Sequence, residues 1–263
     1  MSDEILYDVA GGVGTITLNR PDAMNALDIA TKEQLKAAVE RAAEDDAVRC
    51  VVVSGTGRAF CVGQDLKEHV ELLAAGNSEQ LWSTVPEHYA PIAQGLAGMP
   101  KPVVAAVNGV AAGAGASIAF ACDFRVLADT AGFNLAFAGV ALSCDTGISW
   151  TLPRLIGTAK ATDLLYFPRT VKAAEAMELG LASRVVPADE LATATAELAT
   201  MLADGPTVAY GAIRRSINYS ATHTLAESLE FEGTQMKLTG DTEDHPSAVK
   251  SFVAKERPVF KGR

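Results

Sequence analysis

Hydrophobic positions in the first half of the chain fall into two alternating patterns. Short apolar runs bounded by glycine, proline or asparagine are typical of buried strands. They occur at residues 5–9, 13–18, 50–54, 103–107, 122–127 and 132–134. Between them, apolar residues recur every three or four positions and predict helices over about 28–44, 66–75 and 79–98, the first capped by Asp28. Strands that alternate with helices predict right-handed crossovers and a largely parallel α/β fold.

The second half of the chain has a different pattern. From Gly147 onward the spacing of apolar residues is helical, with breaks at glycine and proline. The clearest amphipathic segments span residues 190–203, 206–220 and 224–239. A helical tail of this length joined to an α/β core often covers a neighbouring surface or a partner subunit.

Composition and charge exclude several partners. The chain has 263 residues, of which 49% are hydrophobic and 21% charged, proportions that are ordinary for a globular protein. Its formal net charge of −10 argues against a nucleic acid or an anionic membrane as the main partner. The acidic start MSDEILYDVA lacks the layout of a signal peptide, and no apolar run approaches the roughly 20 residues that span a bilayer. We therefore expect a soluble cytoplasmic protein.

The four cysteines form neither a CxxC pair nor a cluster with histidine. They are Cys50, Cys61, Cys122 and Cys144. Two of them lie inside apolar strand-like runs, so we expect buried free thiols in a reducing compartment and no metal site.

Residues 101–121, KPVVAAVNGVAAGAGASIAFA, run from an apolar strand into a helix through alanine and glycine. Gly113 and Gly115 flank Ala114 in this run. A strand that enters a helix through small residues leaves backbone N–H groups free where no bulky side chain covers them. Such a turn can bind a negative charge, or its small residues can simply let a buried helix pack closely against a sheet. The stretch alone leaves both interpretations open.

Five segments occur in a fixed order along the chain. They are LNRPDAMNALD (18–28), GRAFCVGQDL (57–66), KPVVAAVNGVAAGAGASIAFACDFRVLAD (101–129), GISWTLPRLIG (147–157) and FVAKERPVF (252–260). Together they resemble the crotonase superfamily, the enoyl-CoA hydratase/isomerase family. The resemblance covers nearly the full chain, and several motifs in register are more specific than any one alone.

The resemblance implies a spiral core of repeated ββα units, over residues 1–195, that binds an acyl-CoA thioester. It also implies a helical oligomerisation region, over residues 196–263, that joins subunits into a homotrimer or a dimer of trimers. The thioester is the substrate, and no other cofactor is implied. In the family two backbone N–H groups stabilise an enolate-like thioester oxygen, and the matching residues are Gln64 and Ala114. Such donors are worth about 10²–10³ in rate each. The Gln64 side chain need not take part; its alternative role is a solvent-facing residue at a helix start.

Coenzyme A itself is held largely by main-chain groups in this family. The matching positions are Arg58, Ala59, Phe60 and Leu66. Phe252 and Lys255 match positions that reach a coenzyme A bound mainly by another subunit. Lys255 would contact a phosphate; alternatively, it is a solvated lysine on a helix.

The chain departs from the hydratase pattern at both glutamates that activate water. Ser117 occupies the first position and Phe137 the second. Neither side chain can act as a carboxylate base, a role worth about 10²–10⁴ in rate. Asp145 matches the aspartate of dienoyl-CoA isomerases and of isomerases in aromatic acyl-CoA pathways. In an apolar pocket its pKa would be raised, which favours proton transfer near neutral pH, but it can equally be the N-cap of the next helix.

Histidine chemistry is the weaker alternative. An aryl-CoA dehalogenase of this superfamily uses an aspartate at the Asp145 position as nucleophile, with a tryptophan where this chain has Phe137. Its histidine base corresponds to Ala90, and His88 would lie on a different helix face. The remaining histidines are expected to be solvated, and they are His69, His223 and His245.

The resulting prediction is an acyl-CoA enzyme of the hydratase/isomerase family that moves a double bond, with Asp145 as acid and base. The alternatives are an enoyl-CoA hydratase of fatty-acid metabolism and a non-catalytic acyl-CoA-binding protein. A dinucleotide-binding module is rejected because the glycine spacing after the strand is not GxGxxG.

Overall fold

The computed structural model of the protein describes residues 3–263. Its strands are divided between two sheets. The larger sheet has the strand order β1-β2-β3-β5-β7-β10. Its strands are β1 (Ile5–Ala10), β2 (Val13–Leu18), β3 (Cys50–Gly55), β5 (Val103–Val107), β7 (Phe124–Ala128) and β10 (Arg184–Val186). The smaller sheet has the order β4-β6-β8-β9. Its strands are β4 (Ala59–Cys61), β6 (Val110–Ala112), β8 (Gly132–Asn134) and β9 (Thr170–Lys172).

Successive pairs of strands place one strand in each sheet, so the chain advances as a spiral. β3 and β4 form the first pair, β5 and β6 the second, and β7 and β8 the third. Pairing along each sheet is parallel, except for the β1–β2 and β8–β9 pairs, which are antiparallel. The buried run Val103–Val107 lies at the centre of the larger sheet, between β3 and β7. The predicted α/β spiral with a largely parallel core is confirmed.

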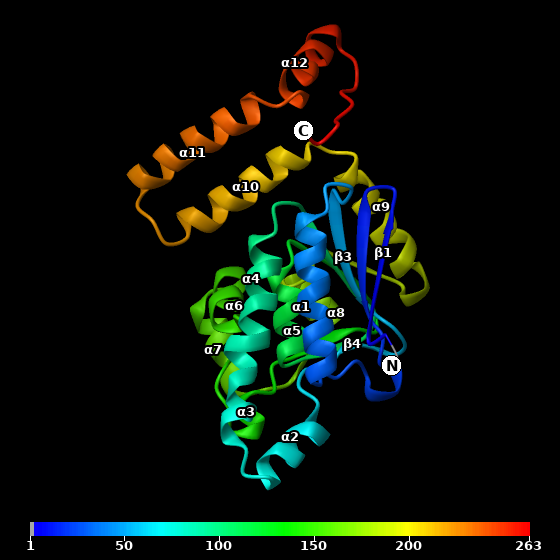
Figure 1. Cartoon of the computed structure of the whole chain (residues 1–263), viewed down its shortest axis with the longest axis vertical. Coiled ribbons are helices and arrows are strands. Elements are labelled where there is room, and N and C mark those ends of the chain that lie inside the picture. Colours follow the sequence, from blue (N-terminus) through cyan, green and yellow to red (C-terminus); the bar gives the residue numbers. More distant parts are fainter. Residues whose placement is uncertain (1–2) are drawn as a thin grey trace.

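Helices cover the sheets where their apolar stripes predict contact. Helix α1 (Ile29–Glu44) buries Leu35, Val39 and Ala42 on one face, and the Asp28 side chain accepts from the Thr31 N–H at 2.8 Å. α1 packs beside α4 (Ala90–Gly98), and α4 beside α5 (Ala114–Ala121) (Figure 1). α9 (Leu191–Ala203) contacts β2, β3, β5 and β7. No helix among residues 3–263 is both long and apolar enough to cross a membrane.

The structure confirms one expectation about local structure in a modified form and contradicts another. Residues 79–98 are helical throughout, as α3 (Ser78–Thr84), the π-helical turn η2 (Val85–Tyr89) and α4 in succession. Pro86 and Pro91 lack the N–H that a continuous α-helix uses at each position, so the backbone changes its pitch there. The second half is also not purely helical, because β9 and β10 lie in it. Strands of three residues are too short to show a period of two.

The remaining helices connect these parts. They are α2 (Leu66–Ala74), α6 (Ile148–Ile156), α7 (Thr158–Tyr166), α8 (Ala173–Glu178) and the 3₁₀ turns η1 (Pro21–Ala23), η3 (Ala138–Val140) and η4 (Ala188–Glu190). All four cysteines are free, three of them buried and Cys144 half-buried. Burial raises the pKa of the Cys61 thiol to about 12, as expected for an inert buried thiol.

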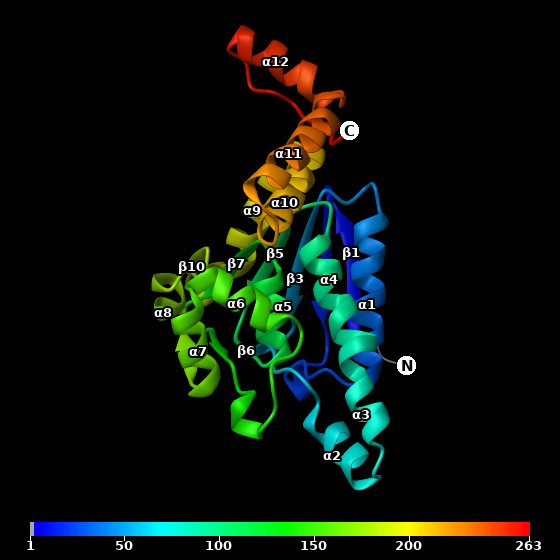
Figure 2. The same cartoon turned by 90° about the vertical axis from the view of Figure 1, so that its left-hand side faces the viewer.

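The last three helices extend beyond the sheets at one end of the molecule (Figures 1 and 2). They are α10 (Thr207–Ser220), α11 (Leu225–Gly240) and α12 (Asp244–Ala254). The expected boundary at residues 195 and 196 falls inside α9, a helix that packs on the larger sheet. The division into a core and an oligomerisation region stays a prediction.

Candidate active site

Two glycine-containing loops meet at the end of the smaller sheet. One follows β4 and contains Gly63; the other follows β6 and opens helix α5 at Ala114. A methyl group at residue 63 would lie 3.2 Å from the Ala114 nitrogen, and one at Gly115 would lie 2.1 Å from the Cys61 carbonyl oxygen. Gly63 also has a φ of +84°, which disfavours any larger residue. Glycine therefore permits the two loops to approach closely.

The N–H groups of Gln64 and Ala114 are free at this junction. Ala114 is the first residue of α5, and the first N–H groups of a helix have no partner inside it. On either side of Gln64, the Gly63 carbonyl accepts from Leu27 N at 2.8 Å and the Asp65 N–H donates to Leu27 O at 3.1 Å. Among residues 3–263 no acceptor binds the N–H of Gln64 or of Ala114. The structure thus places two unpaired donors on adjacent loops.

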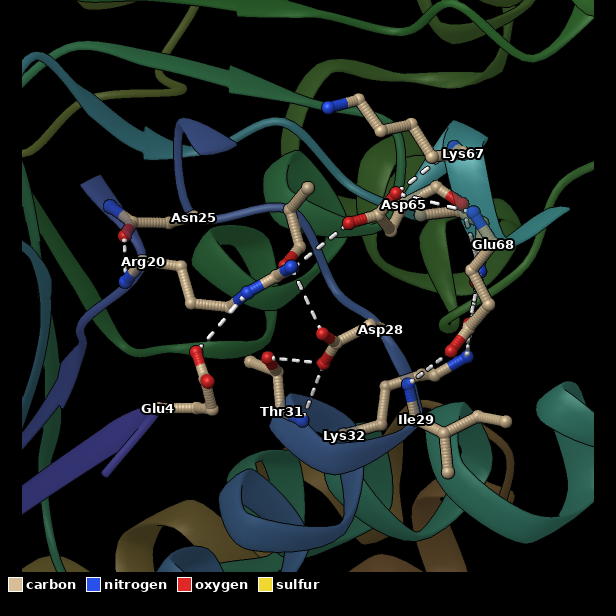
Figure 3. A network of polar contacts seen from close by, with 12 residues as sticks. Glu4, Arg20, Asn25, Asp28, Ile29, Thr31, Lys32, Asp65, Lys67 and Glu68 are labelled. Carbon is tan, nitrogen blue, oxygen red and sulfur yellow. Dashed lines mark hydrogen bonds and ion pairs between the residues drawn. The ribbon is translucent and has the colours of Figure 1, made fainter. Parts of the chain in front are cut away.

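Arg20 holds the loop that carries the Gln64 N–H (Figure 3). Its guanidinium forms ion pairs with Glu4 at 3.1 Å, Asp28 at 3.0 Å and Asp65 at 3.1 Å. Asp65 also caps α2, accepting from Lys67 N at 3.0 Å. Burial alone would raise the pKa of Asp65, but hydrogen bonds from Arg20 and from the α2 backbone lower it. Asp65 is therefore held between Arg20, in the loop after β2, and the first turn of α2.

Asn25 supports the predicted coenzyme A segment. Its Nδ2 donates to the carbonyls of Thr56 at 2.9 Å, Ala59 at 2.9 Å and Phe60 at 3.1 Å. The side chains of Ala59 and Phe60 are fully buried, whereas Arg58 is exposed. Leu66, 61% exposed, is the first residue of α2. The main chain from 58 to 60 thus has a fixed shape, and the coenzyme A contacts themselves stay a prediction.

The Gln64 side chain is bonded inside the protein, so its alternative role as a solvent-facing residue at a helix start is wrong. Its Oε1 accepts from the Tyr89 hydroxyl at 2.6 Å and from Lys32 Nζ at 3.2 Å. Its Nε2 donates to Glu68 Oε2 at 3.3 Å. Neither Lys32 nor Tyr89 is expected at the site from the sequence. One signal was present: Lys32 occupies the apolar stripe of α1, three positions before Leu35 and seven before Val39, where an apolar residue is usual.

A cavity of about 170 Å³ adjoins this network, lined by Lys32, Gln64, Thr84 and His88 among others. His88 lies in the π-helical turn, half-buried, and its Nδ1 has no partner among the described residues. Burial, followed by the nearby charge of Lys32, lowers the pKa of His88. The lining combines these polar groups with the apolar side chains of Ile29, Leu72 and Leu81.

Asp145 lies in a tight turn before α6. Thr146 and Gly147 both have positive φ, and Gly147 is the N-cap of α6 with no side-chain cap, so the expected N-cap role for Asp145 is wrong. The Asp145 carboxylate is half-buried and accepts from Thr146 Oγ1 at 2.8 Å. Burial raises the pKa of Asp145, opposed by that hydrogen bond. Burial raises the pKa of Tyr89, and the charge of Asp145 raises it further.

The two positions that would carry hydratase glutamates are enclosed. Ser117 is fully buried and its Oγ donates to Gly113 O at 3.1 Å. Phe137 is also buried and precedes η3. Both side chains serve packing and local hydrogen bonding, and neither provides a group that could activate water.

The histidines differ in exposure. His223 and His245 are exposed, as expected. His69 is half-buried with its ring edge-on to Trp82 at 6.2 Å between ring centroids, so it is less exposed than His223 and His245. No group of three or more histidine, cysteine or carboxylate side chains within residues 3–263 is arranged to hold a metal ion.

Phe252 and Lys255 lie far from the two donor loops. Both are on or just after α12, at the opposite end of the molecule from α2 (Figure 1). Phe252 is 83% exposed and Lys255 is also exposed. Within one chain they do not join the predicted coenzyme A site, so their role in it requires a neighbouring subunit.

Comparison with known proteins gives consistent matches. Residues 8–263 match the profile of the family described as enoyl-CoA hydratase/isomerase. The 1,2-epoxyphenylacetyl-CoA isomerase of Escherichia coli K12 is 38% identical over 263 residues, covering 100% of both chains. The trans-2-decenoyl-[acyl-carrier-protein] isomerase of Streptococcus mutans is 34% identical, covering 99% of this chain and 98% of its own. A crystal structure from Mycobacterium abscessus, assigned to the same hydratase/isomerase group, superposes with a TM-score of 0.94 at 40% identity and covers 98% of this chain and 100% of its own.

Proposed function

Because this chain belongs to the enoyl-CoA hydratase/isomerase family, we propose that it isomerises a coenzyme A thioester through an enolate, with Asp145 as the acid and base. The observation that supports this proposal is the position of Asp145. Its carboxylate is half-buried in the turn before α6, where it accepts a hydrogen bond from Thr146 Oγ1 and burial raises its pKa.

The two donors stabilise the charge that develops during the reaction. When a base removes a proton next to the thioester carbonyl, the electron pair moves onto the carbonyl oxygen and forms an enolate. The N–H groups of Gln64 and Ala114 bind that oxygen, and removal of one such donor typically costs about 10²–10³ in rate. Because these donors are held in place before the substrate binds, no reorganisation is needed as the charge forms.

Asp145 transfers the proton between two carbons. In a β,γ-unsaturated thioester the carboxylate takes the α-proton, and the electron pair is delocalised over the α- and γ-carbons and the oxygen. The carboxylic acid then returns the same proton to the γ-carbon, which leaves an α,β-double bond. A carboxyl with a raised pKa suits both halves of this cycle, because its basicity is closer to that of the reacting carbon.

Hydration needs a second catalytic group besides Asp145, and this chain has no carboxylate at either position where the family's hydratases place a glutamate. Water addition requires a carboxylate to activate the water as well as an acid to protonate carbon. Ser117 and Phe137 stand at the positions of the two glutamates, and both are buried. Two of the relatives are named 1,2-epoxyphenylacetyl-CoA isomerase and trans-2-decenoyl-[acyl-carrier-protein] isomerase, which supports isomerisation, and two others are named probable enoyl-CoA hydratases.

The proposal includes an assembly. Phe252 and Lys255 of one subunit would reach the coenzyme A bound by another, in a homotrimer or a dimer of trimers. No cofactor beyond the thioester is needed for the proton transfer, and the proposed location is the cytoplasm. The exposed positions of Phe252 on α12 and of Lys255 just after it support this arrangement.

A turnover assay with three thioesters tests the proposal: 1,2-epoxyphenylacetyl-CoA, trans-2-decenoyl-CoA and crotonyl-CoA. The Asp145→Asn variant keeps the size of the side chain but removes the base, so we expect kcat for isomerisation to fall by about 10²–10⁴. Asp8→Asn, an exposed aspartate on β1, is the matched control and should keep full activity.

Other outcomes would favour the alternatives. Hydration of crotonyl-CoA that survives Asp145→Asn would indicate a hydratase that does not use this carboxylate. Micromolar binding of all three thioesters by calorimetry, with no turnover of any, would indicate a non-catalytic binding protein.

A further inference from the structure

The side-chain amide of Gln64 forms hydrogen bonds with residues on three helices of the fold, α1, η2 and α2. Lys32 on α1 and Tyr89 on η2 both donate to Oε1, at 3.2 Å and 2.6 Å. Glu68 on α2 accepts from Nε2 at 3.3 Å. An ammonium group can only donate, so Lys32 requires the amide oxygen to face it and sets the orientation of the whole amide.

The lysine in this network is costly to bury. Lys32 is 1% exposed, and its Nζ is satisfied by Gln64, by Thr84 Oγ1 at 2.9 Å and by Glu68 at 3.7 Å. Buried ion pairs are often no more stabilising than well-packed apolar residues of similar volume. A methionine or leucine in this position would continue the apolar stripe of α1. Stability of the fold therefore does not explain the charge.

The backbone of η2 also departs from the usual helix. Residues Val85–Tyr89 form a π-helical turn, a rare conformation that occurs frequently at functional sites. Tyr89, at the end of this turn, is 1% exposed and directs its hydroxyl to Gln64. The turn thus places a tyrosine hydroxyl against the Gln64 amide.

We infer that Lys32 and Tyr89 are positioning residues, which hold the Gln64 amide and through it orient the Gln64 N–H toward the enolate oxygen. The inference rests on the proposed function, since it assigns a purpose to a network behind one of the proposed donors. The main chain around residue 64 is tied to Leu27 by its two flanking peptide groups. The Gln64 N–H lies in the same planar peptide unit as the Gly63 carbonyl, so the remaining freedom is a tilt of that unit about its hydrogen bond to Leu27, and the anchored side chain limits this tilt by holding the Cα of Gln64.

Ionisation of bound acetoacetyl-CoA measures this effect without knowledge of the natural substrate. This thioester forms an enolate that absorbs in the near ultraviolet, so a pH titration of the complex reports how strongly the site stabilises the charged form. In Tyr89→Phe and Lys32→Met we expect enolate formation to weaken about tenfold, a shift of about one pH unit, as one supporting hydrogen bond is lost. Affinity for free coenzyme A, measured by calorimetry, should stay unchanged.

Two control variants separate positioning from a general structural role. Lys101→Met removes another buried lysine, whose Nζ donates to Ala42 O at 3.0 Å and Asp45 O at 2.9 Å at the end of α1. Tyr7→Phe removes a tyrosine hydroxyl that has no partner among the described residues. Both should leave the ionisation of bound acetoacetyl-CoA as in the parent protein.

The outcomes distinguish the inference from the proposed function. In the first outcome, acetoacetyl-CoA bound to the parent protein forms its enolate at a lower pH than free acetoacetyl-CoA, and Tyr89→Phe and Lys32→Met lower that pH by the same amount. The positioning role is then wrong and the oxyanion site stands. Should Lys32→Met fail to fold, Tyr89→Phe alone decides between these results. If the parent protein leaves enolate formation unchanged, the proposed enolate chemistry is wrong, and the positioning role with it.

Discussion

At the scale of single residues, the site contains charges in places where burial makes them costly. Asp145 is half-buried, and Thr146 supplies its one hydrogen bond from a side chain in the described structure. Lys32 is fully buried and satisfied by several partners. A desolvated carboxylate with few partners stores an unfavourable free energy that a general base can use, because protonation relieves it.

Replacement of Asp145 by asparagine should therefore stabilise the protein. The pKa of Asp145 is higher in the folded than in the unfolded state, so its destabilising effect is absent below the unfolded-state pKa. The effect grows as the pH rises through the folded-state pKa and is complete above it. Thermal unfolding at several pH values should show Asp145→Asn melting roughly 2–4 °C above the parent at neutral pH, the shift that 1 kcal/mol produces in a chain of this size. The difference should shrink in acid.

Asp8→Asn is the control for this measurement, because Asp8 is exposed. It should leave the melting temperature nearly unchanged at every pH. A melting temperature of Asp145→Asn equal to or below that of the parent at neutral pH would show that the carboxylate is not strained by burial.

At the scale of elements, the site depends on how closely two strand-to-helix junctions approach each other. The junction of β4 and α2 carries Gly63, and the junction of β6 and α5 carries Gly113 and Ala114. A side chain at residue 63 would lie 2.8 Å from Ala112 O and 3.2 Å from Ala114 N. The separation of the two donors is thus set by the absence of one β-carbon.

A glycine-to-alanine pair tests this dependence. Gly63→Ala and Gly76→Ala both place alanine at a positive φ, +84° and +69°, so both should lose roughly 1–2 kcal/mol of stability. Gly76 has no neighbour within 4 Å, whereas alanine at residue 63 must push the Ala114 loop away. We expect only Gly63→Ala to lose about 10² in kcat, since displacements near 1 Å can have that effect. Equal activity of the two variants would contradict this account.

At the scale of the whole molecule, the last three helices are joined to the core through few contacts and expose apolar side chains. Arg214 on α10 pairs with Asp123 at 2.6 Å and donates to the carbonyls of Leu96 and Met99. The exposed apolar residues of α10, α11 and α12 include Ile213, Ile217, Leu225, Leu229, Met236, Phe252 and Val253. An apolar surface of this kind is typical of a face that is covered by another subunit.

Charges on that surface should therefore disrupt the proposed trimer. Leu229 and Met236 lie seven residues apart, on the same face of α11. The double variant Leu229→Glu with Met236→Glu should elute at the mass of one chain in size-exclusion chromatography with light scattering, and its KM for acyl-CoA should rise. Glu232→Gln, on the same helix, should keep the parent mass. A parent protein that already runs as a single chain would contradict the proposed assembly.

The sequence alone determined the features that depend on neighbouring residues. Buried strands such as Val103–Val107, the Asp28 cap of α1 and the helical tail follow from local patterns, and the structure confirms them. The glycine-flanked turn at Ala114 was also visible, because a strand entering a helix through small residues has a local signature. The chemistry assigned to it remains a prediction.

Only the tertiary structure decided how distant side chains meet. Lys32, Gln64 and Tyr89 come from three separate elements, and nothing local shows that a lysine in an apolar stripe is paired and buried. The same limit explains the short strands β9 and β10, which exist because β8 and β7 offer unpaired edges. Local periodicity reports which face of an element is buried. Packing between segments far apart in the chain decides what lies against that face. It therefore also decides which N–H groups, carboxylates and ammonium groups share one site.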